Sequence, residues 1–357
     1  MQYYALAALL AGAIASPLPQ DLDWAAIDSL EPVPSADIPV VNAAAAASTV
    51  SYAPAQAATS VAAAVQADPT DVTPKVKRDN SACATTPTSD DTDSAFTSNG
   101  DFSTAANGAS APAGYVQVYQ NQAGSSQGIY GYMGYSVLPT YDVQQCSENC
   151  DAVLGCQSFN IYFERDPSVD PTSSCSNPPS ETVIKCVYYG GPITSDSATN
   201  VGQWRDDFHV VIAGSNAYVN HSITEPDGYS GAVFLGNSAI NAPLDCNGHD
   251  TYMGVKLFDS APFDANLCAT ACSAQSDYNR AHPDSDGYFQ TCQFFNTYVL
   301  YENNVAVGQY CSLYNETWAP SYATNDGQYR GDDHYTIGYS YSFSNSTGGA
   351  DEPTSCS

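Results

Sequence analysis

The side chains best suited to chemistry in this sequence are an arginine, an aspartate and a histidine that occur twice at the same spacing. The two sets are Arg205, Asp207 and His209, and Arg330, Asp332 and His334. On a β-strand, residues two apart point to the same face, so we expect each set to form a row. A cation, a carboxylate and an imidazole in one row could bind an anion, a sugar or a metal ion.

The same rows also have a structural interpretation, in which the arginine pairs with the aspartate and the histidine helps to hold the sheet. The chain has nine Lys and Arg residues, three of which are Lys75, Lys77 and Arg78. Because two of the six others stand at matched positions of the rows, we favour the structural task over ligand binding, and ligand binding over catalysis. We assign no catalytic residue.

No other motif for catalysis stands out. Ser-His-Asp hydrolases often carry Gly-x-Ser-x-Gly between a strand and a helix, and no such elbow is expected here. Acid pairs such as Asp206-Asp207 and Asp332-Asp333 are common in a chain with 38 acidic residues. A glycosidase needs two carboxylates at a defined separation in a cleft, which a sequence does not show. We predict a protein that is not an enzyme and that needs no cofactor or metal.

The rows belong to a unit that the chain repeats. Residues 198–209 align without a gap with residues 323–334, and residues 156–162 match residues 292–298 as Cys-Gln-x-Phe-Asn-x-Tyr. A Cys-x3-Cys motif precedes each copy. Repetition of one cysteine-bearing unit predicts two similar domains, each of which accounts for its own cysteines.

Helix and strand signals surround the cysteines in both copies. Residues 140–150 and 260–272 each predict a helix, on which Cys-x3-Cys places both thiols on one face. Residues 156–163 and 292–299 alternate as half-buried strands do. A short strand that begins with a cysteine follows in each copy, and then the strand with the Arg-Asp-His row.

This order of cysteines resembles the core of the PAN/apple domain family. The shared pattern is Cys-x3-Cys, then Cys-x2-Phe-x-x-Tyr, then Cys-x-x-Tyr or Cys-x-Leu-Tyr, and it covers residues 114–219 and 228–343. Members of the family have an antiparallel sheet that cradles one helix, with disulfides between helix and sheet. The resemblance implies an α+β fold of two similar disulfide-stapled domains, at residues 114–219 and 220–357, the second with a polar C-terminal tail.

The resemblance also implies a disulfide pairing. Four bridges would join helix to sheet, namely Cys146–Cys186, Cys150–Cys156, Cys268–Cys311 and Cys272–Cys292. A bridge between the ends of the second domain would join Cys246 to Cys356. The first domain departs from the pattern: Cys83 and Cys175 remain, and they pair if all 12 cysteines are bonded. Zinc binding by Cys-x3-Cys is the alternative, which an oxidising environment disfavours.

The charge of the chain excludes some classes of partner. With 38 acidic and nine basic residues, the formal net charge is -29. Such a chain would repel nucleic-acid phosphates and anionic membrane surfaces. The acidity is compatible with solubility, an acidic medium or cationic partners.

The N-terminus predicts export. Residues 1–15 contain an apolar run that ends in Ala13-Ile14-Ala15, which is typical of a signal peptide cut after Ala15. The run is shorter than the roughly 20 residues that a membrane span needs, so we expect no membrane span. Three sequons, at Asn220, Asn315 and Asn345, predict N-linked glycans on exposed turns.

A maturation step is predicted next. Residues 16–78 are rich in Ala, Pro, Val and Asp and contain no cysteine, a composition that predicts a disordered pro-peptide. This segment ends at Lys77-Arg78, which resembles the dibasic site of kexin-type processing proteases. Residues 79–113, rich in Ser, Thr and Asp, predict a flexible stalk.

Aromatic residues are the other means of recognition, because their faces are apolar and their edges polar. We expect most of them to pack in the core. The candidates are Tyr115, Tyr119, Tyr130, Tyr132, Tyr135, Tyr188, Tyr189, Trp204 and Tyr329.

The sequence as a whole predicts a secreted recognition protein of fungal type, which binds carbohydrate or protein ligands at the cell wall or in the extracellular space. A fold resemblance carries little weight for function by itself. The alternatives are a secreted glycan-active hydrolase and a structural cell-wall glycoprotein without a specific ligand. The two copies differ in the loop around Cys175 and in residues 273–290, where we expect distinct partners.

Overall fold

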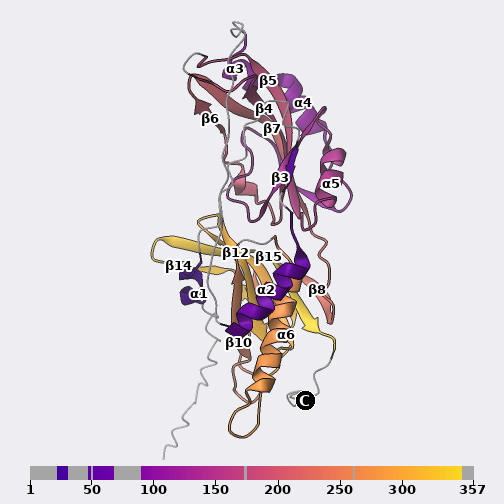
Figure 1. Cartoon of the computed structure of the whole chain (residues 1–357), viewed down its shortest axis with the longest axis vertical. Coiled ribbons are helices and arrows are strands. Elements are labelled where there is room, and N and C mark those ends of the chain that lie inside the picture. Colours follow the sequence, from indigo (N-terminus) through magenta and orange to yellow (C-terminus); the bar gives the residue numbers. More distant parts are fainter. Residues whose placement is uncertain are drawn as a thin grey trace, which may run out of the picture.

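Antiparallel sheets make up most of the structure, with one large sheet in each half of the elongated molecule (Figure 1). The computed structural model describes residues 22–30, 47–49, 51–67, 90–172, 175–259 and 262–347. Every strand pair in these residues is antiparallel.

The first sheet has the strand order β1-β3-β5-β4-β7-β2, with β6 paired to β7. Its strands are β1 (Ala47–Thr49), β2 (Tyr115–Gln122), β3 (Tyr132–Leu138), β4 (Ser158–Pro167), β5 (Ser180–Tyr189), β6 (Gly202–Arg205) and β7 (Phe208–Asn220). Helix α5 (Val143–Asp151) packs on one face, where Cys146 and Cys150 lie in a core with Phe159 and Tyr188.

The second sheet has the order β10-β12-β11-β15-β14, with β8 paired to β15. Its strands are β8 (Tyr229–Gly236), β10 (Tyr252–Phe258), β11 (Phe294–Glu302), β12 (Val305–Tyr314), β14 (Gly327–Arg330) and β15 (Asp333–Asn345). This order matches β3-β5-β4-β7-β6 with β2 on β7 in the first sheet. Helix α6 (Ala265–Ala281) packs on one face, where Cys268 and Cys272 lie in a core with Phe295 and Leu313.

The smaller elements include a small sheet and two short helices. Strands β9 (Ala239–Ile240) and β13 (Ala323–Asn325) form a separate two-stranded sheet. Two short 3-10 helices, η1 (Ser195–Ser197) and η2 (Pro320–Tyr322), precede β6 and β13. Among the helices of the described residues, none is long and apolar enough to cross a membrane.

An aspartate begins each of the two disulfide-bearing helices. The carboxylate of Asp142 accepts a hydrogen bond from the backbone N–H of Gln145 at 3.0 Å, and that of Asp264 accepts one from Asn266 at 2.9 Å. Such side chains satisfy N–H groups that have no partner within the helix. Helix α6 continues to Ala281, so the first part of the insertion at residues 273–290 is helical.

Each of these two helices is bonded to its sheet by two disulfides. The four bonds whose two cysteines are both described are Cys146–Cys186, Cys150–Cys156, Cys268–Cys311 and Cys272–Cys292. These are the helix-to-sheet pairs that the family resemblance implied. Cys175 and Cys246 are also disulfide-bonded, and their expected partners, Cys83 and Cys356, lie outside the described residues.

The expectation of a flexible stalk at residues 79–113 is wrong for the part that the structure describes. Helices α3 (Asp93–Thr97) and α4 (Gly100–Gly108) pack against β7. The ring of Phe102 stacks on Phe163, with centroids 4.2 Å apart, and Asn216 donates a hydrogen bond to the carbonyl of Ala106 at 2.8 Å. A few apolar side chains therefore suffice to anchor this polar stretch to the sheet. The first sheet thus carries α3 and α4 in addition to α5.

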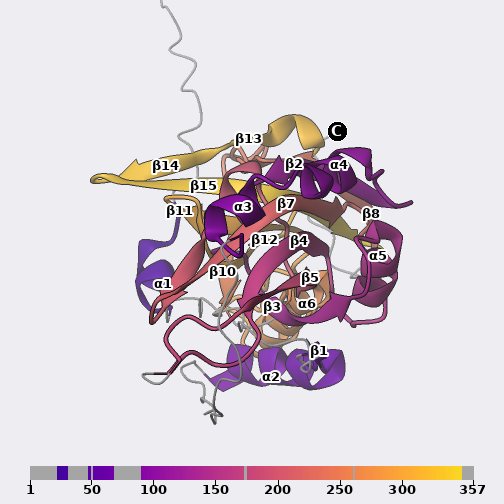
Figure 2. The same cartoon turned by 90° about the horizontal axis from the view of Figure 1, so that it is seen from above.

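The expectation of disorder at residues 16–78 is also wrong in part. Helix α1 (Trp24–Asp28) covers the second sheet, where Leu22 and Ile27 are buried. Strand β1 extends the first sheet at β3, and α2 (Pro54–Ala67) runs alongside α6 (Figures 1 and 2). The other residues of this range, Ala15 and the dibasic site Lys77-Arg78 lie outside the described residues.

The two halves meet end to end through buried polar contacts. The hydroxyl of Tyr130 in the first half donates to the carbonyl of Phe258 at 2.8 Å, and the N–H of Phe263 donates to the carbonyl of Gly190 at 2.7 Å. Tyr130 is fully buried in the core of the second half. These contacts join the two sheets at the place where the halves meet.

Candidate functional site

The repeated Arg-x-Asp-x-His motif forms the tip of a β-hairpin in each half. Strand β6 ends at Arg205, β7 begins at Phe208, and these two residues are partners in the ladder. Arg330 and Asp333 are partners in the same way between β14 and β15. The expectation that arginine, aspartate and histidine form a row on one strand is therefore wrong, because a two-residue turn separates them.

The turn residues adopt the conformation that such hairpins require. Asp206 has φ = 51° and Gly331 has φ = 64°, in the left-handed region that two-residue hairpin turns use. The two predicted carboxylates, Asp207 and Asp332, lie in the turns and are exposed. The backbone N–H of Asp207 donates to the carbonyl of Ser176 at 3.0 Å.

Each hairpin presents one exposed aromatic ring that is stacked on a histidine. Trp204 is 65% exposed, and its ring lies 4.2 Å from that of His209 at an interplanar angle of 3°. Tyr329 is 69% exposed, and its ring lies 4.1 Å from that of His334 at 7°. We call residues 202–209 and 327–334 the aromatic hairpins.

The other aromatic candidates are not available to a ligand in this way. The buried ones are Tyr115, Tyr119, Tyr130, Tyr135, Tyr188 and Tyr189. Tyr132 is half-buried. Trp204 and Tyr329 therefore stand apart from the remaining candidates, at equivalent positions of the two repeats.

Ion pairs join the part of each aromatic hairpin near its turn to neighbouring elements. Arg205 bonds to Asp170 at 2.7 Å, and His209 bonds to Asp93 at 2.6 Å. The hydrogen bond from His209 lowers the pKa of the Asp93 carboxyl. In the second half Arg330 bonds to Asp28 through both of its terminal nitrogens, and this bond raises the pKa of Arg330 above its usual range.

A glycine allows each aromatic hairpin to lie close to its partner strand. Gly202 has φ = +105° and Gly327 has φ = +117°, and a Cβ atom at either position would lie 2.0 Å from a backbone carbonyl oxygen, of Val210 or Tyr335. Only glycine fits such a site. Both copies therefore carry the same local requirement for the hairpin that presents Trp204 or Tyr329.

Both aromatic hairpins lie on the same side of the molecule in the view of Figure 1, one on each sheet. Seen from above, the β14–β15 hairpin extends well beyond the body of the protein (Figure 2). Two projecting aromatic rings on a rigid frame can contact a long or repeating ligand at two points.

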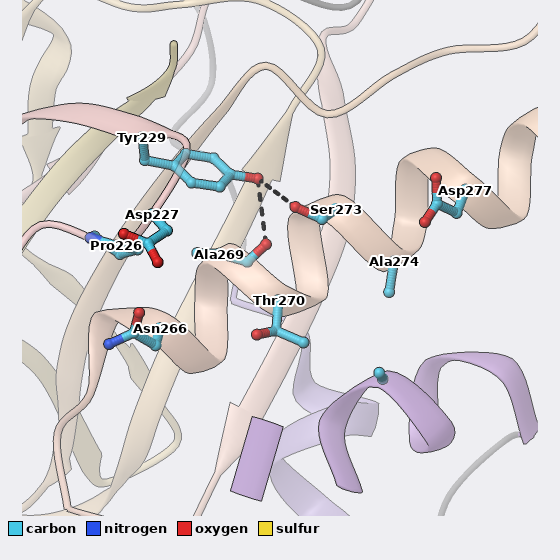
Figure 3. Close-up of a pocket in the computed structure, with 10 residues that line it drawn as sticks. Pro226, Asp227, Tyr229, Asn266, Ala269, Thr270, Ser273, Ala274 and Asp277 are labelled. Atoms are coloured by element: carbon cyan, nitrogen blue, oxygen red, sulfur yellow. Dashed lines mark hydrogen bonds between the residues drawn. The ribbon is translucent and has the colours of Figure 1, made fainter. Parts of the chain in front are cut away.

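A groove between α2, α6 and the start of β8 is a second place where a ligand could fit (Figure 3). It encloses about 380 Å³. Its lining residues are Ala62, Pro226, Asp227, Tyr229, Asn266, Ala269, Thr270, Ser273, Ala274 and Asp277. The hydroxyl of Tyr229 is already within hydrogen-bond distance of the carbonyl of Ala269 (3.2 Å) and of Ser273 Oγ (3.1 Å). No sequence motif pointed to this groove.

Two carboxylates and a lysine form a buried cluster on the first sheet. Lys185 Nζ lies 2.5 Å from Glu164 and 3.5 Å from Asp166, and all three side chains are at most 4% exposed. Burial, together with the nearby Glu164 carboxylate, raises the pKa of Asp166 to about 9. Both carboxyl groups are buried within ion-pair distance of Lys185. In the described residues, no group of three or more His, Cys, Asp or Glu is placed to hold a metal ion.

The raised pKa of Asp166 predicts a pH dependence of stability. The unfolded chain releases this proton near its ordinary pKa of 3.8, whereas the folded protein keeps it, so stability is lost as pH rises from about 4 to about 9. We expect a lower free energy of unfolding in urea at about pH 8 than at about pH 5. Asp166→Asn should weaken this dependence and the exposed control Asp101→Asn should not; an equal dependence in both would contradict the assignment.

The three sequon asparagines lie at or next to strand ends. Asn220 ends β7, Asn345 ends β15 and Asn315 follows β12. The side chain of Asn345 donates to the carbonyl of Cys292 at 3.4 Å, a bond that uses the nitrogen to which a glycan would be attached. Glycosylation at these positions stays a prediction.

Comparisons with known proteins found no match. No family model matches the sequence, no curated protein matches it, and no solved structure matches it. The described residues form antiparallel sheets that are bonded to helices by disulfides.

Proposed function

We propose that the chain is a secreted, non-catalytic recognition protein with two PAN/apple-like domains that binds carbohydrate at the cell wall or in the extracellular space. The single observation that carries this proposal is the pair of exposed, histidine-stacked rings of Trp204 and Tyr329 on equivalent hairpins. The two rings stand at equivalent positions of the two repeats, each stacks on a histidine, and they are 65% and 69% exposed, so an aromatic face remains available to a ligand.

The shape of these rings suits a sugar. Each ring is flat and apolar on its face, with polar groups at its edge, and a sugar ring likewise has an apolar face and a rim of hydroxyls. Stacking on His209 or His334 holds each ring in one orientation before a ligand arrives, which lowers the entropy lost on binding. Two such rings on one frame add avidity for a polymer, because the second contact is intramolecular.

Charge narrows the class of glycan. The net charge of -29 would repel polyanionic polysaccharides at low ionic strength. Neutral glycans, or glycans with amino groups, fit this charge best.

The predicted route to the outside of the cell agrees with the disulfides. The four disulfides within the described residues form in an oxidising compartment. A signal peptide at residues 1–15 would direct the chain into such a compartment. Maturation by a kexin-type protease after Arg78 and glycans at the three sequons belong to the same proposal.

A glycan hydrolase is the weaker alternative. It requires two accessible carboxylates that flank a scissile bond, whereas Glu164 and Asp166 are buried and bound to Lys185. A protein ligand is the second candidate, because exposed Trp and Tyr are also frequent centres of protein interfaces. A structural wall protein would have no specific ligand at all.

A binding screen tests the proposal. Secreted protein is incubated with insoluble chitin, β-glucan and mannan and with a printed glycan array, and the bound fraction is measured. We expect retention on at least one neutral or amino-containing glycan, and binding to a neutral glycan should be independent of salt because stacking is not ionic. Absence of binding to every glycan, with the protein shown to be folded by circular dichroism, would contradict the proposal and favour a protein ligand.

A further inference from the structure

Residues 22–30 lie on an aromatic face of the second sheet, opposite the side that α6 covers. Leu22 is 3% exposed and Ile27 is 7% exposed, and both pack in one apolar cluster with the sheet. We call the sheet side of this cluster the aromatic face; its main residues are Tyr298, Leu300, Tyr310, Tyr335 and Ile337. The rings of Tyr298 and Tyr310 are stacked with centroids 5.0 Å apart, which gives the segment a flat apolar floor.

Polar contacts fix the position and direction of the segment. The backbone N–H of Asp23 donates to the hydroxyl of Tyr310 at 3.0 Å, and the ring of Trp24 meets that of Tyr335 edge to face at 4.9 Å. The guanidinium of Arg330 lies 4.9 Å over the ring of Trp24 and also bonds to the carboxylate of Asp28. The face therefore binds two aliphatic side chains, one indole and one acid from a short segment, of which Leu22 precedes α1 and the other three lie in it.

The matching face of the first sheet keeps Tyr162 and Ile212 in an apolar cluster but differs at two central positions. The positions that match Leu300 and Tyr310 in the repeat are Glu164 and Lys185, which are paired with each other. An apolar segment that packed over Glu164 and Lys185 would have to cover charged groups, which is costly. The two halves thus differ at this face by a charged pair in the first and by Leu300 and Tyr310 in the second, a difference that shared folding of the two repeats does not explain.

The segment is attached to this face by the chain upstream of the predicted cleavage site. Helix α2 lies against α6, where Ala57 contacts the cluster of Leu267 and Ala271, and Tyr52 donates to Asp264 at 2.7 Å. A cut at Lys77-Arg78 would leave residues 22–67 held by non-covalent contacts alone. The effective concentration of a tethered segment, about 1 mM, would be lost, so the segment could then dissociate on dilution.

We propose that the aromatic face is a binding site for a short helical protein segment with aliphatic, aromatic and acidic side chains, which residues 22–30 occupy in the uncut chain. Cleavage turns this internal occupant into one that a partner can replace. The site does not use Trp204 or Tyr329, but it shares Arg330 with the second aromatic hairpin.

The test uses the full, uncut chain and a fluorescein-labelled peptide of residues 22–30. In the triple variant Trp24→Ala, Ile27→Ala, Asp28→Asn, the internal segment is weakened and the face becomes free. We expect saturable binding of the wild-type peptide to this variant below about 1 mM, the concentration against which the tethered segment competes. The uncut wild-type chain should not bind the peptide, and a peptide with the same three substitutions should bind neither chain.

The repeat supplies a matched control. Arg330→Gln, added to the triple variant, should weaken peptide binding about tenfold because it removes the ion pair and the contact with the indole, whereas Arg205→Gln in the other hairpin should leave it unchanged. Four outcomes would overturn the proposal: no binding to the triple variant, equal binding to the wild-type chain, equal effects of the two arginine changes, or unfolding of the triple variant in circular dichroism. The last would show that the face does not exist without its own segment.

Discussion

Replacing both exposed rings, Trp204→Ala with Tyr329→Ala, is expected to lower the affinity for a polymeric glycan by about 100-fold or more. Each single change should cost about tenfold, because a central aromatic contact is commonly worth more than 1.4 kcal/mol. The double change removes both contacts and therefore the avidity as well. Isothermal titration with a soluble oligosaccharide from the array, and pull-down on the insoluble polymer, measure the two effects separately.

The control for this prediction is Tyr288→Ala. Tyr288 is 58% exposed and lies outside both aromatic hairpins, so its loss tests whether any exposed tyrosine matters. We expect wild-type binding from this variant. Equal losses in Tyr288→Ala and Tyr329→Ala would show that the hairpins have no special role.

Among the four disulfides whose cysteines are both described, removal of Cys268–Cys311 is expected to cause the largest loss of stability. In the chain-entropy model a bond that spans 43 residues contributes about 4 kcal/mol, and the Cys150–Cys156 bond, which spans six, contributes about 2 kcal/mol. A loss of about 4 kcal/mol is a large part of the roughly 5–15 kcal/mol that stabilises a domain. Urea denaturation of the Cys268→Ala, Cys311→Ala variant measures the first value.

The matched variant is Cys150→Ala, Cys156→Ala. Cys150–Cys156 joins α5 to the chain just before β4, and Cys268–Cys311 joins α6 to β12, so the comparison sets a short closed loop against a long one. A larger loss from the short bond than from the long one would contradict the entropic explanation. It would point instead to packing of the buried cysteines as the main contribution.

The elements around the cysteines could be predicted because their signals are local and occur twice. Alternating apolar residues from Phe159 and from Phe295 onward mark central strands, and Asp142 and Asp264 mark helix starts. The pairing of helix and strand cysteines followed from the family resemblance, and the i, i+4 spacing alone placed both thiols on one helix face. The duplicated strand order was within reach of the sequence for the same reason.

The hairpin turn was missed because residues two apart fit a continuous strand as well as a hairpin. Arg205, Asp207 and His209 are two residues apart, which fits one face of a strand as well as a hairpin. Gly331-Asp332 is a turn signal of the kind that two-residue hairpins use, and in the second copy it could have revealed the turn. The stacked aromatic rings depend on the cross-strand register, which the spacing by itself does not give.

The ordered parts of the N-terminal region were missed because composition averages over a segment. Leu22, Trp24 and Ile27 are few among many Ala, Pro and Asp residues, and the segment is too short to fold without support. Its structure depends on a complementary face more than 200 residues away along the chain, such as that around Tyr310. Only the tertiary structure shows that this face exists.

The fluorescence of Trp204 tests the central claim most directly. In the Trp24→Phe, Trp318→Phe variant Trp204 is the only one of the three tryptophans that remains, and it is exposed in the absence of ligand. Titration with the oligosaccharide selected on the array should give a saturable blue shift, with the same affinity as calorimetry, because a stacked sugar excludes water from the indole. Calorimetric binding without any change in this emission would contradict the assignment of the aromatic hairpins as the binding site.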